Sequence, residues 1–146
     1  MKMRVSAVQF ALRDVGSFDE FRRQVVHYVR NAAEYGAQFL LFPEFMTTAL
    51  LSIGPDAESG EPIDRLPEYT EAYTSLFTGL AREYDMYIIG GTHVTRAGGQ
   101  LRNTAFLFGP DGSVRTQDKL HITPTEKTEW NVKEGEGVQV FDTPFG

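Results

Sequence analysis

Residues 38–42 (Gln-Phe-Leu-Leu-Phe) restrict the fold more than any other segment, because they are almost entirely apolar and end at Pro43. A strand with one solvated face alternates apolar and polar residues, whereas a strand covered on both faces is a short continuous apolar run. Proline has no N–H to donate to a sheet, so Pro43 ends the strand. The segment therefore predicts a strand buried on both faces, which is typical of layered α/β folds.

A helix is predicted just before this strand, over residues 18–35. Ser17-Phe18-Asp19-Glu20 has the form of a capping box, in which the Ser17 hydroxyl accepts from the Glu20 N–H and the Glu20 carboxylate accepts from the Ser17 N–H. Gly36 is a natural stop for the helix. Between these ends, apolar residues recur at helical spacing, namely Phe21, Val25, Tyr28, Val29, Ala32 and Ala33.

The remaining elements complete an α/β pattern. A second helix is expected from Pro67 to Tyr84, with Pro67 in its first turn, and residues 52–65 are expected to be a loop. Further strands are expected at residues 3–10, 86–94, 101–108, 113–119 and 138–141, with turns at 97–100 and 110–112. Parallel strands joined through helices thus precede antiparallel hairpins, which predicts a mixed sheet with two main helices. The 146 residues fit one domain.

Composition excludes several classes of function. The net charge of −6, from 14 basic and 20 acidic residues, disfavours nucleic acid as a partner, because phosphate binding requires clustered Lys and Arg. No apolar run approaches the ~18–20 residues that cross a membrane, and the start lacks the apolar segment of a signal peptide, so we expect a cytoplasmic protein without membrane contact. There is no cysteine, which excludes disulfides, thiolate metal sites and the commonest soft nucleophile.

Neither the histidines nor the glycines indicate a cofactor site. His27, His93 and His121 lack the paired spacing of converging metal ligands, so we expect them to be structural or exposed. Gly90-Gly91 lies within the strand predicted at residues 86–94, and such a pair is more often a bulge or a close backbone approach than a phosphate cradle. We therefore expect no metal and no cofactor.

Glu44 is the first candidate for chemistry, because it lies just after the buried strand at residues 38–42. Reactive groups in open α/β sheets collect at the carboxyl ends of parallel strands. A carboxylate flanked by Pro43 and Phe45 would lose solvation, which favours proton uptake and suits a general base. The alternative, a carboxylate that caps the backbone N–H groups of the next segment, is equally compatible with the sequence.

Lys119 is the second candidate, at the end of a predicted hairpin strand. A lysine near a reacting carbonyl stabilises the developing oxyanion, although an exposed lysine at a strand end is the commoner case. Glu126 and Glu129 follow closely, and either could approach Lys119 and hold it charged. Both could equally be surface residues beside Trp130.

Four segments, taken in order, resemble the nitrilase superfamily, also called the carbon–nitrogen hydrolases. They are the opening strand at residues 5–10, the segment 36–44 that ends in Glu44, the hairpin at 103–112, and the segment 118–126 around Lys119. The resemblance implies that Glu44 is the general base, that Lys119 stabilises the oxyanion, and that Glu126 is the second glutamate, with Glu129 as the reserve. It also implies half of a four-layer α-β-β-α sandwich and a reaction without a cofactor.

The family's nucleophile is a cysteine, and the resemblance places it beyond residue 146. We therefore expect residues 1–146 to be the N-terminal part of a single carbon–nitrogen hydrolase domain, inactive alone. The whole protein is expected to hydrolyse non-peptide carbon–nitrogen bonds of a small amide or carbamoyl substrate, as an amidase or carbamoylase does. The uncovered sheet face is expected to meet the missing C-terminal half or a second copy in a homo-oligomer. The alternatives are a catalytically incomplete relative that binds or assembles, and an unrelated α/β binding module.

Overall fold

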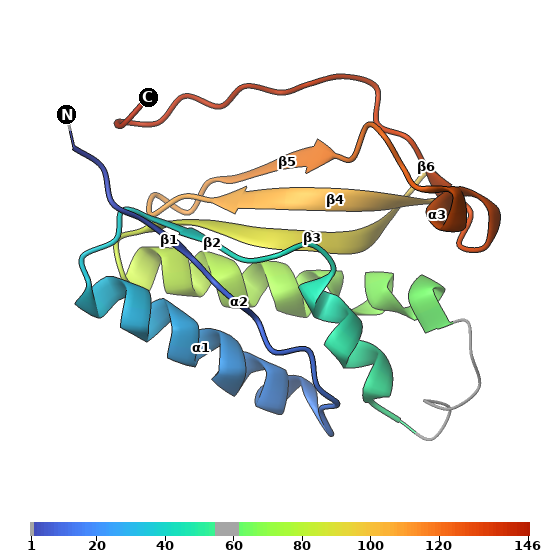
Figure 1. Cartoon of the computed structure of the whole chain (residues 1–146), viewed down its shortest axis with the longest axis horizontal. Helices are drawn as coiled ribbons and strands as arrows, with labels where there is room; N and C mark the ends of the chain where they lie inside the picture. Colours follow the sequence, from blue (N-terminus) through green and yellow to red (C-terminus); the bar gives the residue numbers. More distant parts are fainter. Residues whose placement is uncertain (1, 55–61) are drawn as a thin grey trace.

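A computed structural model describes residues 2–54 and 62–146 of the chain. Within these ranges six strands form one mixed sheet in the order β1-β2-β3-β4-β5, with β6 beside β4 (Figure 1). The strands are β1 (Val5–Ala7), β2 (Phe39–Leu41), β3 (Tyr87–Ala97), β4 (Gln100–Phe108), β5 (Val114–Asp118) and β6 (Val132–Lys133). The first three are parallel to one another, and β4 and β5 are antiparallel additions. The predicted mixed α/β sheet is confirmed.

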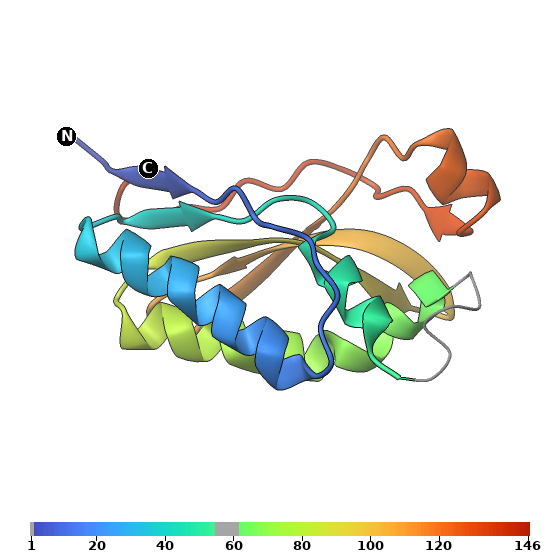
Figure 2. The ribbon, with the colours of Figure 1, turned by 60° about the horizontal axis from the view of Figure 1, so that its bottom comes forward.

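Two helices cover one face of this sheet, α1 (Phe18–Glu34) and α2 (Thr70–Glu83) (Figures 1 and 2). The predicted cap of α1 is present in altered form. The Ser17 hydroxyl accepts from the Glu20 N–H, but the Glu20 carboxylate accepts from the N–H of Gly16, one residue earlier than expected. Among the helices of the described ranges, none has the length and apolar character needed to span a membrane.

The hydrophobic core lies between these helices and the sheet. On the helix side, Tyr73 and Phe77 of α2 are fully buried. Their rings meet Phe106 and Phe108 of β4 at centroid distances of 5.3 Å, Tyr73 to Phe106 and Phe77 to Phe108. Because side chains alternate along a strand, Asn103, Ala105 and Leu107 point to the opposite face. That opposite face carries the candidate site.

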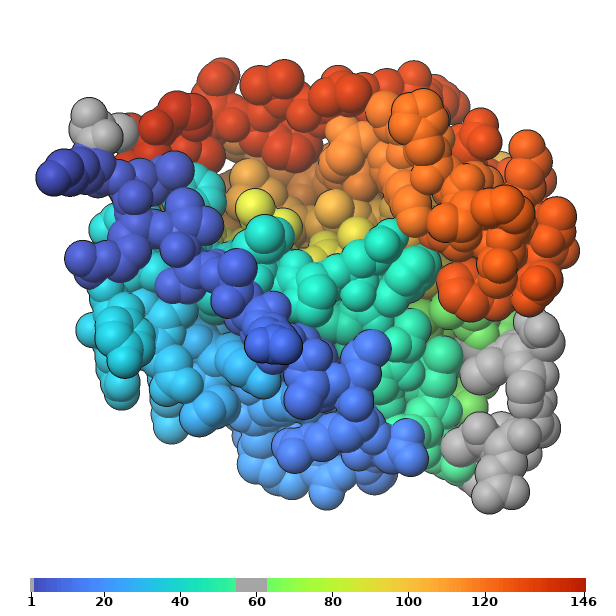
Figure 3. Space-filling view, in the orientation of Figure 1, coloured from blue at the N-terminus to red at the C-terminus, as the bar shows by residue number. Residues whose placement is uncertain are grey.

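Within the described part of the chain, the second face carries only the short helix α3 (Pro124–Thr128), near β6, and no helix that runs along the sheet. The last residues run along β5 and back toward the N-terminus, and Figure 3 shows a hollow between them and the body of the molecule. Phe145 reaches the Phe39 and Tyr87 rings at 5.8 and 6.3 Å. Leu41 nevertheless stays 40% exposed. The prediction that strand 38–42 is buried on both faces is therefore wrong for this chain, which covers one face only.

Two other predicted strands also differ from the structure. Residues 138–141 are not a strand, because the side-chain amide of Gln117 takes the place of a strand ladder. It donates to the Gly137 carbonyl at 3.0 Å and accepts from the Gln139 N–H at 2.6 Å. The strand expected at 3–10 pairs only over Val5–Ala7, since Phe10 turns into the core and packs against Phe21.

The second helix begins later than predicted. A 3-10 helix (Pro62–Tyr69) contains Pro67 and precedes α2, as such tight turns often do at helix N-termini. Another 3-10 helix, Met46–Ser52, begins two residues after Glu44, with Phe45 as its N-cap. The loop predicted at 52–65 is thus helical at its two ends, at Ser52 and at residues 62–65, and residues 55–61 lie outside the described ranges.

Gly90 and Gly91 form the predicted bulge. The register of β3 against β4 shifts between Ile89 and Thr92. Gly91 has a φ of 74°, and a Cβ there would collide with the carbonyl oxygen of Pro43. Only glycine has both the left-handed conformation and the room for this approach. The bulge therefore lets β3 come close to the residue that precedes Glu44.

We predict that Gly91→Ala lowers the free energy of unfolding by roughly 2–4 kcal/mol, because it combines a disfavoured φ with a backbone collision. Gly79→Ala is the matched control. Gly79 lies inside α2 with open space around it, so alanine there should be neutral or add roughly 0.5–1 kcal/mol. Urea unfolding of both variants measures the difference, and equal stabilities would contradict the role assigned to Gly91.

Candidate active site

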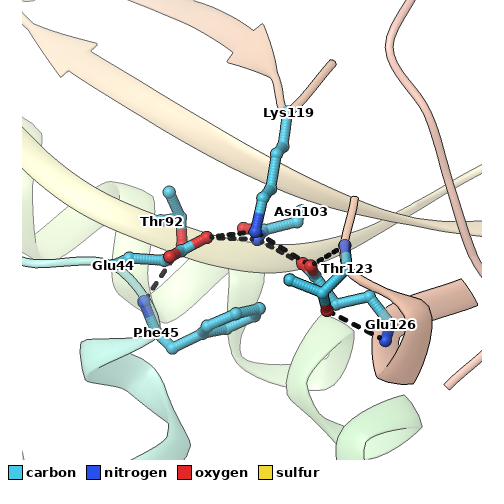
Figure 4. A network of polar contacts seen from close by, with 7 residues as sticks. All are labelled: Glu44, Phe45, Thr92, Asn103, Lys119, Thr123 and Glu126. Atoms are coloured by element: carbon cyan, nitrogen blue, oxygen red, sulfur yellow. Dashed lines mark hydrogen bonds and ion pairs between the residues drawn. The ribbon is translucent and has the colours of Figure 1, made fainter. Parts of the chain in front are cut away.

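Three predicted residues from separate segments meet on the face of the sheet opposite the helices (Figure 4). Glu44 follows β2, Lys119 follows β5, and Glu126 lies on the short helix α3 (Pro124–Thr128). The Lys119 Nζ lies 2.9 Å from Oε1 of Glu44 and 2.8 Å from Oε2 of Glu126. The ammonium thus bridges two carboxylates that are 82 residues apart in the sequence.

The backbone around Glu44 is fixed from two sides. Before it, Pro43 rests against the Gly91 bulge. After it, Phe45 adopts a left-handed conformation with φ 56°, and its N–H donates to the Thr92 hydroxyl at 3.0 Å. The Glu44 side chain itself is 47% exposed. The expected loss of solvation next to its neighbours therefore does not occur in this chain, and only one side of the carboxylate is covered by protein.

Glu126 is the buried member of the group, with a side chain only 1% exposed. It occupies the third position of a capping box on α3: its carboxylate accepts from the Thr123 N–H at 2.8 Å, and its own N–H donates to the Thr123 hydroxyl. Burial raises the pKa of the Glu126 carboxyl. Hydrogen bonds from Lys119, Thr123 and Asn103 outweigh burial and bring this pKa down to about 2. Glu126 is therefore a permanent anion near neutral pH.

Lys119 is held through its backbone as well as its ammonium. Its N–H donates to the Asn103 carbonyl at 2.8 Å, and its carbonyl accepts from the Gly135 N–H at 2.9 Å. Burial lowers the pKa of the Lys119 ammonium, but the hydrogen bonds and charges of Glu126 and Glu44 outweigh burial and raise this pKa above its ordinary value. Lys119 is thus a fixed cation rather than the exposed strand-end lysine that the sequence favoured.

Glu129, the reserve for the second glutamate, ends α3 and is exposed. The sequence does contain a signal that separates it from Glu126. Thr123-Pro124-Thr125-Glu126 has the spacing of a capping box with proline in the first turn, and this spacing turns Glu126 back toward the start of its helix.

Asn103 belongs to the same group of contacts and was not singled out from the sequence. Its amide Nδ2 donates to Oε1 of Glu44 at 2.9 Å and to Oε1 of Glu126 at 2.8 Å (Figure 4). The sequence contains little signal for it, because Asn103 lies between the polar residues Arg102 and Thr104 and only the second half of β4 is apolar.

The histidines lie outside this group. His27 and His121 are exposed, whereas His93 is buried between the hydroxyls of Thr47 and Thr70, each 3.0 Å away. Burial lowers the pKa of His93 to about 4. Across residues 2–54 and 62–146, no cluster of three or more His, Asp or Glu is arranged to hold a metal ion.

The group leaves two reactive positions available. An ammonium has three N–H groups, and Lys119 uses two of them on Glu44 and Glu126. Within the described ranges, Oε1 of Glu44 accepts both of the hydrogen bonds that this carboxylate makes, and Oε2 accepts none. In this described part of the chain, one N–H of the ammonium and one oxygen of the Glu44 carboxylate thus have no hydrogen-bond partner, and the ammonium also lies 5.8 Å from the centre of the Phe45 ring.

The comparisons with known proteins identify the family. The profile of the carbon-nitrogen hydrolase family matches residues 4–146, so the chain belongs to this family. It is similar to a probable hydrolase, YhcX, of Bacillus subtilis, with 42% identity over 99% of this chain and 28% of that protein. It is also similar to omega-amidase NIT2-A of Xenopus laevis, with 31% identity over 99% of this chain and 52% of that protein.

The fold agrees with this assignment. One similar structure is a variant of the amidase from Nesterenkonia sp. AN1, modified by Michael addition of acrylamide at its active site cysteine. It has a TM-score of 0.71 and 22% identity, and the match covers 93% of this chain and 51% of that one. The chain therefore has a nitrilase-like fold. It spans about half the length of these amidases and a smaller share of YhcX.

The lowered pKa of Glu126 predicts a pH-dependent stability. A carboxyl whose pKa falls from 4.5 to about 2 on folding contributes roughly 3 kcal/mol above pH 4.5, and this contribution is lost as the pH falls through about 2. We expect Glu126→Gln to remove most of this acid dependence in urea unfolding between pH 6 and pH 2. Glu129→Gln, an exposed neighbour, should keep it. A Glu126→Gln variant with wild-type pH dependence would contradict the assigned contacts.

Proposed function

We propose that the protein containing this chain hydrolyses the amide bond of a small molecule through a thioester intermediate. The nucleophile is a cysteine thiol that lies outside these 146 residues. The observation that carries the proposal is the 2.9 Å contact between Lys119 and Glu44, in which Oε2 of Glu44 has no partner among the described residues. A base and a cation held together on an open face are the two groups that a thiol needs to attack an amide.

Glu44 acts as the general base. Its Oε2 takes the proton of the thiol as the sulfur attacks the carbonyl carbon of the substrate, and the carbonyl oxygen becomes an oxyanion. The protonated Glu44 then gives its proton to the departing nitrogen, so ammonia or an amine leaves and a thioester forms. Water enters, and Glu44 removes one of its protons as the water oxygen attacks the thioester carbon. Glu44 then gives this proton to the departing sulfur, which restores the thiol and the Glu44 carboxylate as a carboxylic acid is released.

Lys119 stabilises the oxyanion in both tetrahedral intermediates. Two of its N–H groups are fixed on carboxylates, which aims the third at the position where negative charge develops. Such preorganised donors contribute more than flexible ones because they need no reorganisation during the reaction. The buried anion Glu126 balances the lysine charge throughout the cycle. Glu44 is then free to exchange protons without leaving Lys119 unpaired.

The amide class of substrate rests on the relatives. An omega-amidase and an amidase are among the similar proteins, and a simple amide fits the chemistry of a thiol, a base and an ammonium. The open sheet face suggests in addition that further polypeptide, or a second copy of the chain, covers it in the active protein. This face exposes the apolar side chain of Leu41, and the C-terminal segment exposes those of Val138 and Val140. Apolar surface of this kind is usually covered by another segment or chain.

We predict that Glu44→Gln and Lys119→Ala each lower kcat/KM of the longer protein by roughly 100- to 1000-fold, because they remove a proton acceptor and an oxyanion donor. Hydrolysis of a series of short primary amides, followed by release of ammonia, measures this. Glu129→Gln should change kcat/KM by less than about threefold, as is usual for an exposed residue.

The 146-residue chain by itself should release no ammonia, because it contains no cysteine. Turnover by this chain, or near-full rates in Glu44→Gln and Lys119→Ala, would contradict the proposed roles. A longer protein that binds amides without hydrolysing them would instead support a binding or scaffold function.

A further inference from the structure

Asn103 occupies an unusual environment for an amide. It lies in the middle of β4 and is 1% exposed, on the face of the sheet opposite the helices. Its register partner on β3 is Val94, which is fully buried. A buried amide lowers stability unless its polar atoms find partners. The Nδ2 of Asn103 has partners for both of its hydrogens, and both partners are carboxylates of the candidate site.

The same residue contacts every member of the predicted group. Through its side chain it donates to Glu44 and Glu126, and through its backbone carbonyl it accepts from the Lys119 N–H at 2.8 Å. Side-chain distances of 2.9 and 2.8 Å are those of charge-assisted hydrogen bonds. The three charged residues come from three different segments of the chain. Asn103 is therefore hydrogen-bonded to all three of these segments.

We propose that Asn103 is a positioning residue that sets the orientation of the Glu44 carboxylate and keeps Glu44 and Glu126 apart on either side of Lys119. The inference rests on the proposed function, in which Glu44 is the general base. In it, Asn103 determines which of the two carboxylate oxygens of Glu44 accepts the proton. Oε1 is held by the amide and the ammonium, which leaves Oε2 to take the proton.

Two features argue that the amide acts through its N–H groups. First, an ammonium alone can pivot between two carboxylates, whereas the two N–H groups of a planar amide diverge in fixed directions and so fix both anions. Second, within the described ranges the Oδ1 of Asn103 is buried and accepts no hydrogen bond. An unsatisfied acceptor lowers stability, so the residue's contribution comes from its donors.

The test replaces the donors while keeping the shape. Asn103→Asp has nearly the same shape but brings a third negative charge, and Asn103→Leu has a similar volume without donors. In the longer protein we expect kcat for amide hydrolysis to fall about 100-fold in both variants, with KM within about threefold, because the base is misaligned rather than the substrate lost. In Asn103→Asp, the fall of kcat/KM at low pH (the acid limb of its pH profile) should also begin at a higher pH. The added negative charge favours protonation of the neighbouring Glu44.

Thr95→Val is the matched control. It removes a side-chain hydrogen bond within the same hairpin, the 2.8 Å contact between Thr95 and Thr104, without touching Glu44 or Glu126. It should lower Tm while leaving the acid limb where it is in the wild type. Asn103 variants that are folded, by Tm and circular dichroism, and that keep wild-type kcat and acid limb would overturn the proposal. If Asn103→Asp fails to fold, the kcat of Asn103→Leu decides.

A second readout separates this proposal from the proposed function. If the wild-type protein hydrolyses no amide, the proposed function fails, but the role of Asn103 can still be measured by ¹³C NMR titration of the labelled glutamates. Loss of the amide donor in Asn103→Leu should raise the titration midpoint of Glu126 by roughly one pH unit. An unchanged midpoint in that variant would overturn the positioning role.

Discussion

The ammonium of Lys119, held between the carboxylates of Glu44 and Glu126, is the contact on which the site depends. Each partner comes from a different segment, so the contact exists only when β2, β5 and α3 are all in place. Two anions and one cation leave a net negative charge, which would be unfavourable in a buried site. The arrangement avoids this cost because Glu126 is buried and fully hydrogen-bonded, whereas Glu44 remains partly open to solvent.

The rest of the fold supports this contact in two ways. The helices bury an aromatic core on one face, and the candidate site lies on the other face. The bulge at Gly90 and Gly91 lets β3 pack directly against the backbone of Pro43, the residue before Glu44. Any side chain at position 91 would collide with the carbonyl oxygen of Pro43. The same chain thus provides a closed core and an open site from one mixed sheet.

The sequence predicted those features that local chemistry determines. The helix over residues 18–35 and the apolar strand before Pro43 are both present, because a cap, helical spacing and a proline stop are local signals. The strand expected at 138–141 is absent because pairing depends on a neighbour, and the Gln117 amide occupies that place. Asn103 was missed for the same reason: its partners come from distant segments, and a single strand sequence does not reveal them.

A double-mutant cycle on the longer protein tests the central claim most directly. It compares kcat/KM for amide hydrolysis in the wild type, Glu44→Gln, Lys119→Met and the combined variant. Groups that act as one unit give non-additive losses, so the double variant should be no slower than the slower single variant within about threefold. Losses that multiply, as for two independent sites, would contradict the claim that this carboxylate and this ammonium form a single catalytic centre.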